Sequence, residues 1–259
     1  MAISATWDPG PYLLFANERL RPALDLMARI PLGAPQRVVD LGCGAGNVTV
    51  LLKQRWLGAD VSGVDGSEAM LAKAREAAPD CRFEQADFAS WTPADAPDLI
   101  YSNAALHWLT DHEHLFLRLT SLLAPGGVLA VQMPAMHDAP LRRLQLEVAA
   151  RGPWAEHLRD AGFARDILTP EQYYDLLRPF SASLDIWQTI YLHVLHGEDA
   201  VPEWAAGSSL RPFLDRLPRE LKAPFREAYA KALRPYYPQR ADGVTLLPFK
   251  RLFIVARKA

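Results

Sequence analysis

Short apolar runs and amphipathic stretches alternate through the first half of this chain. Five runs are typical of buried strands, and they lie at residues 38–41, 61–65, 81–85, 97–103 and 128–133. Between them, apolar residues recur at helical spacing over 48–56, 68–77 and 111–123, with Ser67 and Asp111 as candidate N-caps. This order predicts an α/β fold built on a doubly wound, mostly parallel sheet.

The pattern differs at both ends of the chain. Residues 12–30 predict an N-terminal helix interrupted by Pro22. Beyond residue 134 we expect short helices at 141–150 and 171–177, a long strand at 184–195 and a closing strand at 252–256. Helices over 199–236 should be broken at five prolines, namely Pro202, Pro212, Pro218, Pro224 and Pro235.

We therefore expect three parts. Residues 1–30 form a helical segment that closes over the site, and residues 31–198 with 241–259 form the core sheet. Residues 199–240 form a helical insertion that caps the site.

The sharpest motif follows the first predicted strand, where Asp40 precedes Gly42, Gly44 and Gly46. Glycine suits a sharp bend and a close approach of ligand to backbone, and the helix after such a turn offers N–H groups to the ligand. The spacing departs from the dinucleotide pattern G-x-G-x-x-G, because Asn47 stands where its third glycine would be. Asp40 would also repel a pyrophosphate. The pattern D-x-G-x-G-x-G is typical of S-adenosylmethionine-dependent methyltransferases, whose cofactor carries an ammonium and a sulfonium.

Polar side chains end three further predicted strands. Asp65 lies about twenty residues past the glycine turn, where an acid accepts the ribose hydroxyls in nucleoside-binding folds. Asp87 can accept the adenine amino group with Phe88 beside the ring, and Asn103 ends the fourth strand. Ordinary turn or cap chemistry accounts for each residue alone. Together with Asp40 they predict one crevice for an adenosine-bearing ligand.

Composition narrows the class of protein. The chain has 259 residues and a net charge of −2, and it has no basic stripe of the kind that binds nucleic acid. Cys43 and Cys81 make no disulfide framework. His112 and His114 point apart at a helix start, so no metal site is expected. There is no membrane-length apolar run and no signal-peptide core, so we expect a soluble cytoplasmic protein.

Longer stretches resemble one family in particular. They are DLGCGAGN at 40–47, NAALHWLTDH at 103–112, DIWQTIYLH at 185–193, SLRPFLDRL at 209–217 and LLPFKRLFIVARK at 246–258. On these stretches the chain resembles the trans-aconitate 2-methyltransferase family of class I, Rossmann-like methyltransferases over nearly its whole length. The resemblance implies a seven-stranded sheet with an antiparallel last strand. It also implies methyl transfer from S-adenosylmethionine to one carboxylate of trans-aconitate, a small polycarboxylate.

The resemblance and the motifs together give the expected site. The cofactor-binding residues are Tyr12, Arg19, Asp40, Gly42, Gly44, Asp65, Gly66, Met70, Asp87, Phe88 and Asn103. The substrate-binding residues are His107, Trp108, Arg211 and Arg251, with His107 and Trp108 as candidates for orienting the reacting carboxylate. The chain departs from the family at Ala135-Met136, Gln188 and Lys250, which would alter the preferred acid if these positions touch substrate.

Three other functions stay open at this point. The first is a methyltransferase that acts on another small acid or a phenol. The second is a nicotinamide-dependent oxidoreductase, and the third is a cofactor-binding module without catalytic activity. The glycine spacing and Asp40 argue against the oxidoreductase. The sequence leaves the physiological acid, the carboxylate that is methylated and the oligomeric state undetermined.

Overall fold

The computed structural model describes residues 20–159, 167–207 and 209–259. The chain divides into two compact units. The first extends to Met133 and adds residues 168–188 and 252–259. The second comprises residues 134–167 and 189–251.

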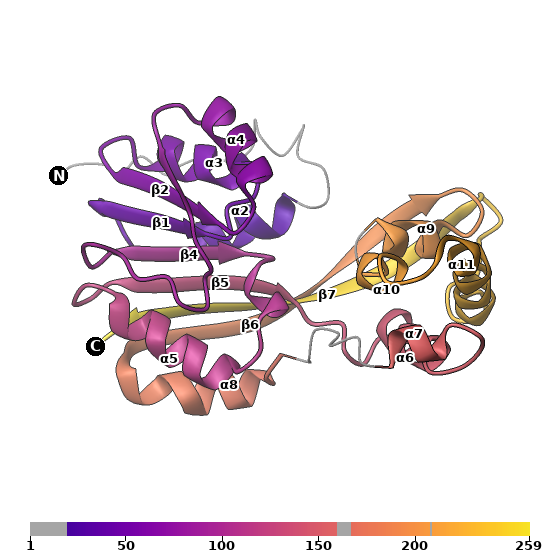
Figure 1. Cartoon of the computed structure of the whole chain (residues 1–259). Helices are drawn as coiled ribbons and strands as arrows, with labels where there is room; N and C mark the ends of the chain where they lie inside the picture. The colour runs from indigo at the N-terminus through magenta and orange to yellow at the C-terminus, as the bar shows by residue number, and fades with distance from the viewer. Residues whose placement is uncertain (1–19, 160–166, 208) are drawn as a thin grey trace. The chain divides into compact units, whose positions relative to one another are not determined.

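A seven-stranded sheet organises the fold, in the order β3-β2-β1-β4-β5-β7-β6 (Figure 1). The strands are β1 (Arg37–Leu41), β2 (Asp60–Asp65), β3 (Arg82–Gln85), β4 (Leu99–Asn103), β5 (Val128–Pro134), β6 (Ser181–His196) and β7 (Val244–Lys258). The first five pair in parallel, so their carboxyl ends share one edge of the sheet. The central strands β4 and β5 are buried along nearly all their length, as the continuous apolar runs predict.

The last two strands run antiparallel to their neighbours. The N–H of Lys258, at the end of β7, donates to the carbonyl of Gly127, just before β5, at 2.8 Å. The N–H of Ala259 donates to the carbonyl of Phe180, just before β6, at 3.0 Å. In both pairs the end of β7 lies beside the start of its neighbour. The expected seven-stranded sheet with an antiparallel last strand is therefore confirmed.

Helices of the first unit match the predicted pattern closely. They are α2 (Arg21–Ala28), α3 (Asn47–Arg55), α4 (Glu68–Ala77), α5 (His112–Leu122) and α8 (Pro170–Leu177), with short 3-10 turns η1 (Leu106–Trp108) and η2 (Arg178–Phe180). The Asp111 side chain accepts the His114 N–H and caps α5 as predicted, whereas Ser67 makes no side-chain cap. Pro22 lies in the first turn of α2 and does not interrupt it. Backbone nitrogens in the first turn of a helix make no intrahelical hydrogen bond, so the missing N–H of proline costs nothing there. The earlier part of the predicted helix lies outside the described residues.

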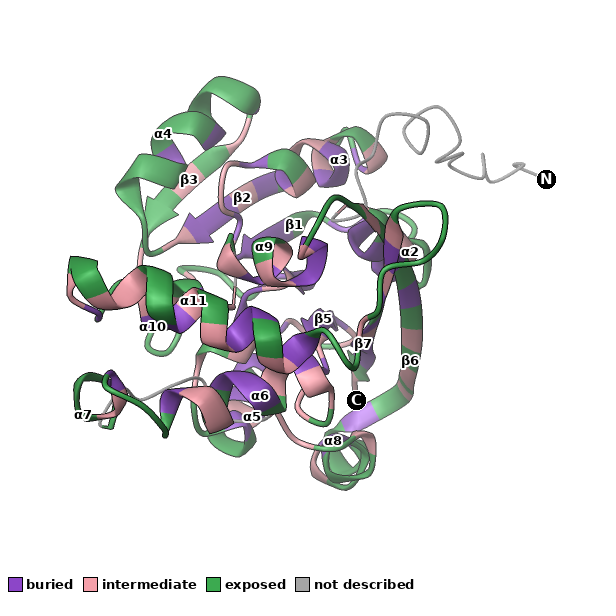
Figure 2. Cartoon of the chain, turned by 90° about the vertical axis from the view of Figure 1, so that its right-hand side faces the viewer, coloured by how far each residue is buried: buried purple, intermediate pink, exposed green. Residues whose placement is uncertain are grey.

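The second unit contains the far ends of β6 and β7 and its own helices. These are α6 (Pro140–Ala149), α7 (Ala155–Leu158), α9 (Ala200–Ala206), α10 (Arg211–Leu214) and α11 (Arg219–Leu233). They enclose a separate apolar core in which the rings of Trp154 and Phe225 meet edge to face at 5.2 Å. Buried and exposed residues alternate along α11 (Figure 2). The unit is larger than the predicted insertion at 199–240, whose capping role stays a prediction.

The prediction that Pro224 breaks a helix is wrong. It lies inside α11, a helix of 15 residues, where its ring removes one backbone hydrogen bond. The helix continues because Phe225, Tyr229 and Leu233 recur at helical spacing and are all buried. Here the burial of one helix face outweighs the local preference of a single residue.

A buried hydroxyl joins α11 to α6 in the second unit. The Tyr229 O–H donates to the Leu141 carbonyl at 2.9 Å, and Tyr229 is fully buried. We expect Tyr229→Phe to lower the free energy of unfolding by about 1–1.5 kcal/mol, because a buried carbonyl loses its partner. Urea unfolding measures this. Tyr236→Phe, at a ring that is 48 % exposed, is the matched control and should change little; equal losses in both would contradict the assignment.

Candidate cofactor and substrate site

The turn between β1 and α3 holds three glycines in the left-handed region. Gly42, Gly44 and Gly46 have φ of 81°, 55° and 81°. The N–H groups of Gly42 and Cys43 both donate to the Val64 carbonyl on β2, at 2.8 and 3.0 Å. A side chain would strain the backbone at each of these three glycines.

Space distinguishes the three glycines further. A Cβ at Gly42 would lie 2.2 Å from the Cβ of Ala105, and one at Gly46 would lie 3.0 Å from Ala74. At Gly44 nothing lies within 4 Å of the same position. Gly42 and Gly46 are therefore required by close packing, while the backbone at Gly44 borders open space that a ligand can enter.

Asp65, at the end of β2, fastens this turn to the next helix. One carboxylate oxygen accepts the N–H of Gly44 and the other accepts the N–H of Ser67, both at 2.9 Å. Each oxygen keeps a second lone pair that can accept a ligand hydroxyl. The predicted contact with ribose stays a prediction, and the structure gives Asp65 a second role in shaping the turn.

Asp40 lies beneath the turn and is only 1 % exposed. Burial raises the pKa of its carboxyl to about 7, and the negative charge of Asp65 also raises it. The Thr49 O–H on α3 donates to Asp40 Oδ2 at 2.6 Å, which lowers that pKa in part. Thr49 was missed at the sequence level, because nothing local shows that it faces β1.

The segment after β3 lies next to the glycine turn. The Phe88 ring reaches within 3.9 Å of the Cβ position at Gly42, while Asp87 is exposed and accepts the Ala89 N–H at 3.0 Å. Arg118 on α5 donates to the carbonyls of Phe88 and Trp91, at 2.5 and 2.6 Å. Arg118 was also missed, because a helix arginine is usually a solvated charge. It holds the predicted adenine-binding segment in place.

The segment after β4 completes this side of the sheet. Asn103 Oδ1 is buried and accepts no hydrogen bond from the described residues. Ala105 packs on Gly42 and so places η1, with His107 and Trp108, beside the glycine turn. The rings of His107 and Trp108 lie 4.7 Å apart, and Trp108 is 50 % exposed. The predicted role of both side chains in orienting the reacting carboxylate stays a prediction.

These groups fit a nucleoside that carries a cation. The open space at Gly44 admits a ligand to the backbone, and Asp40 supplies a buried acid. Asn103 Oδ1 is a buried acceptor to which none of the described residues donates. Gly66 and Met70, at the start of α4, are exposed. Buried acceptors and an acid suit an ammonium or a sulfonium and oppose a phosphate.

Of the remaining predicted residues, two belong to the second unit and two lie outside the described residues. Arg211 and Arg251 belong to the second unit. Arg211 has its side chain 75 % exposed, with Asp215 at 3.5 Å, whereas Arg251 is 6 % exposed and its guanidinium lies 4.8 Å from the Phe249 ring centre. Tyr12 and Arg19 lie outside the described residues. Their roles stay predictions.

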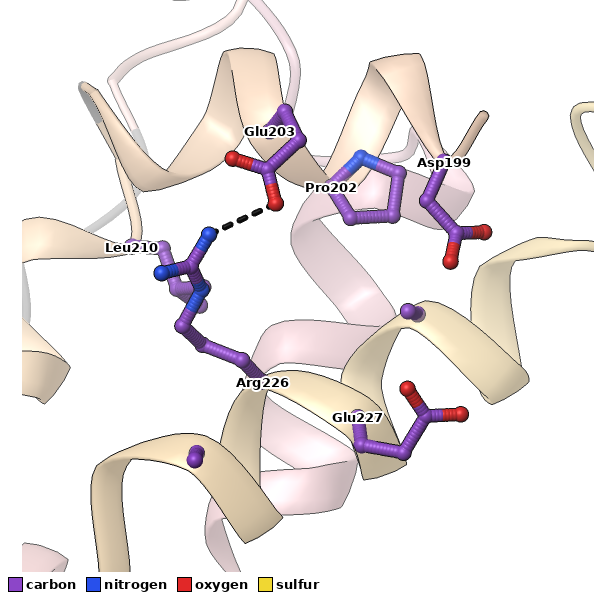
Figure 3. Close-up of a pocket in the computed structure, with 8 residues that line it drawn as sticks. Asp199, Pro202, Glu203, Leu210, Arg226 and Glu227 are labelled. Carbon is purple, nitrogen blue, oxygen red and sulfur yellow. Dashed lines mark hydrogen bonds and ion pairs between the residues drawn. The ribbon is translucent and has the colours of Figure 1, made fainter. Parts of the chain in front are cut away.

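A cavity of about 230 Å³ in the second unit does not suit a polycarboxylate (Figure 3). Three carboxylates line it, those of Asp199, Glu203 and Glu227. Arg226 binds Glu203 at 2.6 Å, and Arg234 binds both Asp199 and Glu227. Because Arg226 and Arg234 are already paired with these three carboxylates, the cavity offers no excess of positive charge to a ligand with several carboxylates.

In residues 20–159, 167–207 and 209–259, which the structure describes, no helix has the length and apolar character needed to cross a bilayer. No three histidine, cysteine or acidic side chains there are grouped to hold a metal ion.

Comparison with known proteins agrees with this geometry. A family model described as "Methyltransferase domain" matches residues 38–127. The YcgJ protein from Bacillus subtilis shares the fold, with a TM-score of 0.60 at 15% identity over 92% of this chain and 98% of its own. An S-adenosylmethionine-dependent methyltransferase from Mesorhizobium loti gives a TM-score of 0.52 at 26% identity over 91% of this chain and 96% of its own. Fold and glycine turn thus define a class I methyltransferase.

The sequence relatives are more specific. The Trans-aconitate 2-methyltransferase of Variovorax paradoxus is 52% identical over 97% of this chain and 98% of its own length. The chain belongs to the trans-aconitate 2-methyltransferase family, and the family expected from the sequence motifs is confirmed.

The close contact at Gly42 leads to a test. Gly42→Ala should lower the free energy of unfolding by more than the ~1–2 kcal/mol of a left-handed alanine alone, because its Cβ also meets Ala105. Gly44→Ala is the matched control, since it has the same backbone strain and open space. Thermal unfolding of both variants compares them, and equal destabilisation would contradict the packing role of Gly42.

Asp65 is tested separately. Asp65→Ala should weaken binding of S-adenosylhomocysteine at least about tenfold, because the turn loses its anchor and the ligand loses an acceptor. Calorimetric titration measures the affinity. Asp60→Ala is the control, an exposed acid at the opposite end of β2. Unchanged binding in Asp65→Ala would rule out a cofactor role for this carboxylate.

Proposed function

We propose that this protein transfers a methyl group from S-adenosylmethionine to one carboxylate of trans-aconitate, giving the monomethyl ester and S-adenosylhomocysteine. The observation that carries the proposal is the 52% identity to a Trans-aconitate 2-methyltransferase across nearly the whole of both chains. The glycine turn and the buried acid Asp40 support the cofactor, as does the buried Asn103 amide oxygen, which accepts no hydrogen bond from the described part of the chain.

Methyl transfer to a carboxylate requires few catalytic groups from the protein. The bound cofactor supplies an electrophilic methyl group on a positively charged sulfur. A carboxylate is already a nucleophile at neutral pH, so no residue has to act as a general base. The side chains must hold the attacking oxygen in line with the methyl carbon and exclude water. Such orientation contributes up to ~7–11 kcal/mol in favourable cases.

Charge decides which groups belong at which carboxylate. Opposite charges are neutralised as the methyl group moves, so a strong cation on the reacting carboxylate would stabilise the ground state and slow transfer. We assign Arg211 and Arg251 to the carboxylates that do not react, as guanidinium groups bind carboxylates at two points. We assign the weaker donors His107 and Trp108 to the reacting carboxylate. Tyr12 and Arg19 are assigned to the methionine end of the cofactor.

The site of action is proposed to be the cytoplasm. Cys43 and Cys81 are both free thiols in the structure, which agrees with a reducing compartment. The small acid is proposed as the principal partner, with no nucleic acid and no membrane involved.

The proposed reaction is tested by the product. Incubation with S-adenosylmethionine and trans-aconitate should give one ester, heavier than the acid by one methylene unit, and product analysis identifies the carboxylate that is methylated. A panel of other small acids and phenols tests the substrate. Turnover of panel members without turnover of trans-aconitate would overturn the proposed substrate, and binding of NAD in place of S-adenosylhomocysteine would overturn the class of reaction.

The arginine assignment has its own test. Arg211→Ala should raise KM for trans-aconitate about tenfold or more and leave KM for the cofactor nearly unchanged, because a charged hydrogen bond to the acid is lost. Arg151→Ala is the matched control, an exposed arginine of the same unit. Steady-state kinetics with each reactant varied measures both constants. Equal loss for acid and cofactor would reject the assignment.

A further inference from the structure

The contact between Thr49 and Asp40 is a buried polar pair next to the glycine turn. Thr49 is fully buried and Asp40 is 1 % exposed. The hydroxyl of Thr49 donates to the carboxylate at 2.6 Å. Thr49 is the third residue of α3, so its position is fixed by the helix that starts at the glycine turn.

Threonine at this position is not explained by packing or by helix formation. Valine has the same shape and suits an apolar surrounding better, and a β-branched residue is a modest helix former at best. A threonine hydroxyl in a helix commonly returns to its own backbone. Here it is directed to Asp40. We infer that threonine is present here because its hydroxyl donates to the Asp40 carboxylate.

Other titratable groups around Asp40 do not replace this donor. Tyr101 is opposite Asp40 in the β1–β4 register, but its O–H donates to the Ala23 carbonyl at 2.8 Å. The Cys43 thiol is directed to the Gly44 carbonyl at 3.7 Å. Asp65 on β2 adds a second negative charge. Among the described residues, burial and the charge of Asp65 raise the Asp40 pKa, and the Thr49 hydroxyl lowers it.

More distant groups act on these neighbours. The charge of Arg55 on α3 lowers the pKa of Tyr101 in part. The charge of Asp40 helps to raise the pKa of the Cys81 thiol, which lies before β3. Burial raises the pKa of both Tyr101 and Cys81, so both are uncharged near neutral pH. The ionised form of Asp40 thus depends on Thr49 within the protein.

We propose that Thr49 is a positioning residue that holds the Asp40 carboxylate ionised and oriented for the cation of the cofactor, so that cofactor binding takes its pH dependence from this pair. The inference rests on the proposed function, because it requires S-adenosylmethionine at the glycine turn.

The expected direction follows from linkage. Burial raises the Asp40 pKa to about 7, so near neutral pH part of the protein carries a protonated Asp40. A cationic ligand favours the ionised form, and binding therefore releases a proton. Affinity rises with pH through the Asp40 pKa and then levels off. Without the Thr49 donor the pKa rises further, and the same increase in affinity requires a higher pH.

Stability of the protein without ligand changes in the opposite sense. The folded Asp40 pKa lies above its ordinary value of 3.8, so this group favours the folded state below that value. The contribution is lost as pH rises from about 4 through about 7. Asp40→Asn removes this dependence, which separates the carboxylate from other titrating groups.

The test compares three proteins by titration calorimetry with S-adenosylhomocysteine, which keeps the ammonium group. The proteins are wild type, Thr49→Val and Thr49→Ser, measured from about pH 5.5 to about pH 8.5. Thr49→Val should bind about fivefold more weakly near pH 7 and about tenfold more weakly near pH 5.5, and it should recover at higher pH, with its curve shifted upward by about one unit. Thr49→Ser keeps the hydroxyl and should retain the wild-type curve.

A second measurement uses the wild-type protein alone. Binding heats in two buffers of different ionisation enthalpy give the number of protons released, which should be a fraction of one proton near pH 7 and should fall toward zero about two units higher. Steady-state kinetics should show a higher KM for the cofactor in Thr49→Val with kcat nearly retained.

Several results would overturn the inference. They are an unchanged pH curve in Thr49→Val, an equal loss of affinity at every pH, or no proton release in the wild type. Absence of any S-adenosylhomocysteine binding would overturn the inference and the proposed cofactor together. Normal pH-linked binding without turnover of trans-aconitate would support the inference and overturn only the proposed substrate.

Discussion

Close backbone contact at the glycine turn is the constraint on which the site depends. The Val64 carbonyl accepts two N–H groups from the turn, Asp65 accepts a third from Gly44, and Ala105 packs where Gly42 has no side chain. The ends of β1, β2 and β4 are thus held close together by contacts around the glycines of the turn. At Gly44 the backbone borders open space, and a ligand can approach the turn there.

Electrostatics at this point agrees with the chemistry of the proposed reaction. Burying a carboxylate is unfavourable unless a donor or a cation accompanies it. Asp40 has the Thr49 hydroxyl as donor, and in our proposal the cation of the cofactor is its second partner. A phosphate ligand would add negative charge to Asp40 and Asp65. The same two acids therefore favour a sulfonium nucleoside over a dinucleotide.

Periodicity predicted the elements well where local pattern and tertiary burial agree. The buried runs became β4 and β5, and Asp111 caps α5 as its spacing indicates. It failed at Pro224, because the buried face of α11 outweighs one lost hydrogen bond. Periodicity also predicted only residues 252–256 as the closing strand, whereas β7 extends over Val244–Lys258. The strand continues through Pro248 because it pairs with β5 and β6.

The sequence by itself determined the glycine spacing, the acids at the strand ends and the family, because these are properties of residues close together in the chain. Tertiary structure alone decided that Ala105 fills the space at Gly42 and that the Thr49 hydroxyl donates to Asp40. It also buried the Asn103 amide oxygen where no described residue donates to it. It also placed Arg211 and Arg251 in a separate unit. The physical reason is that strand order brings distant residues together, and local periodicity carries no record of that order.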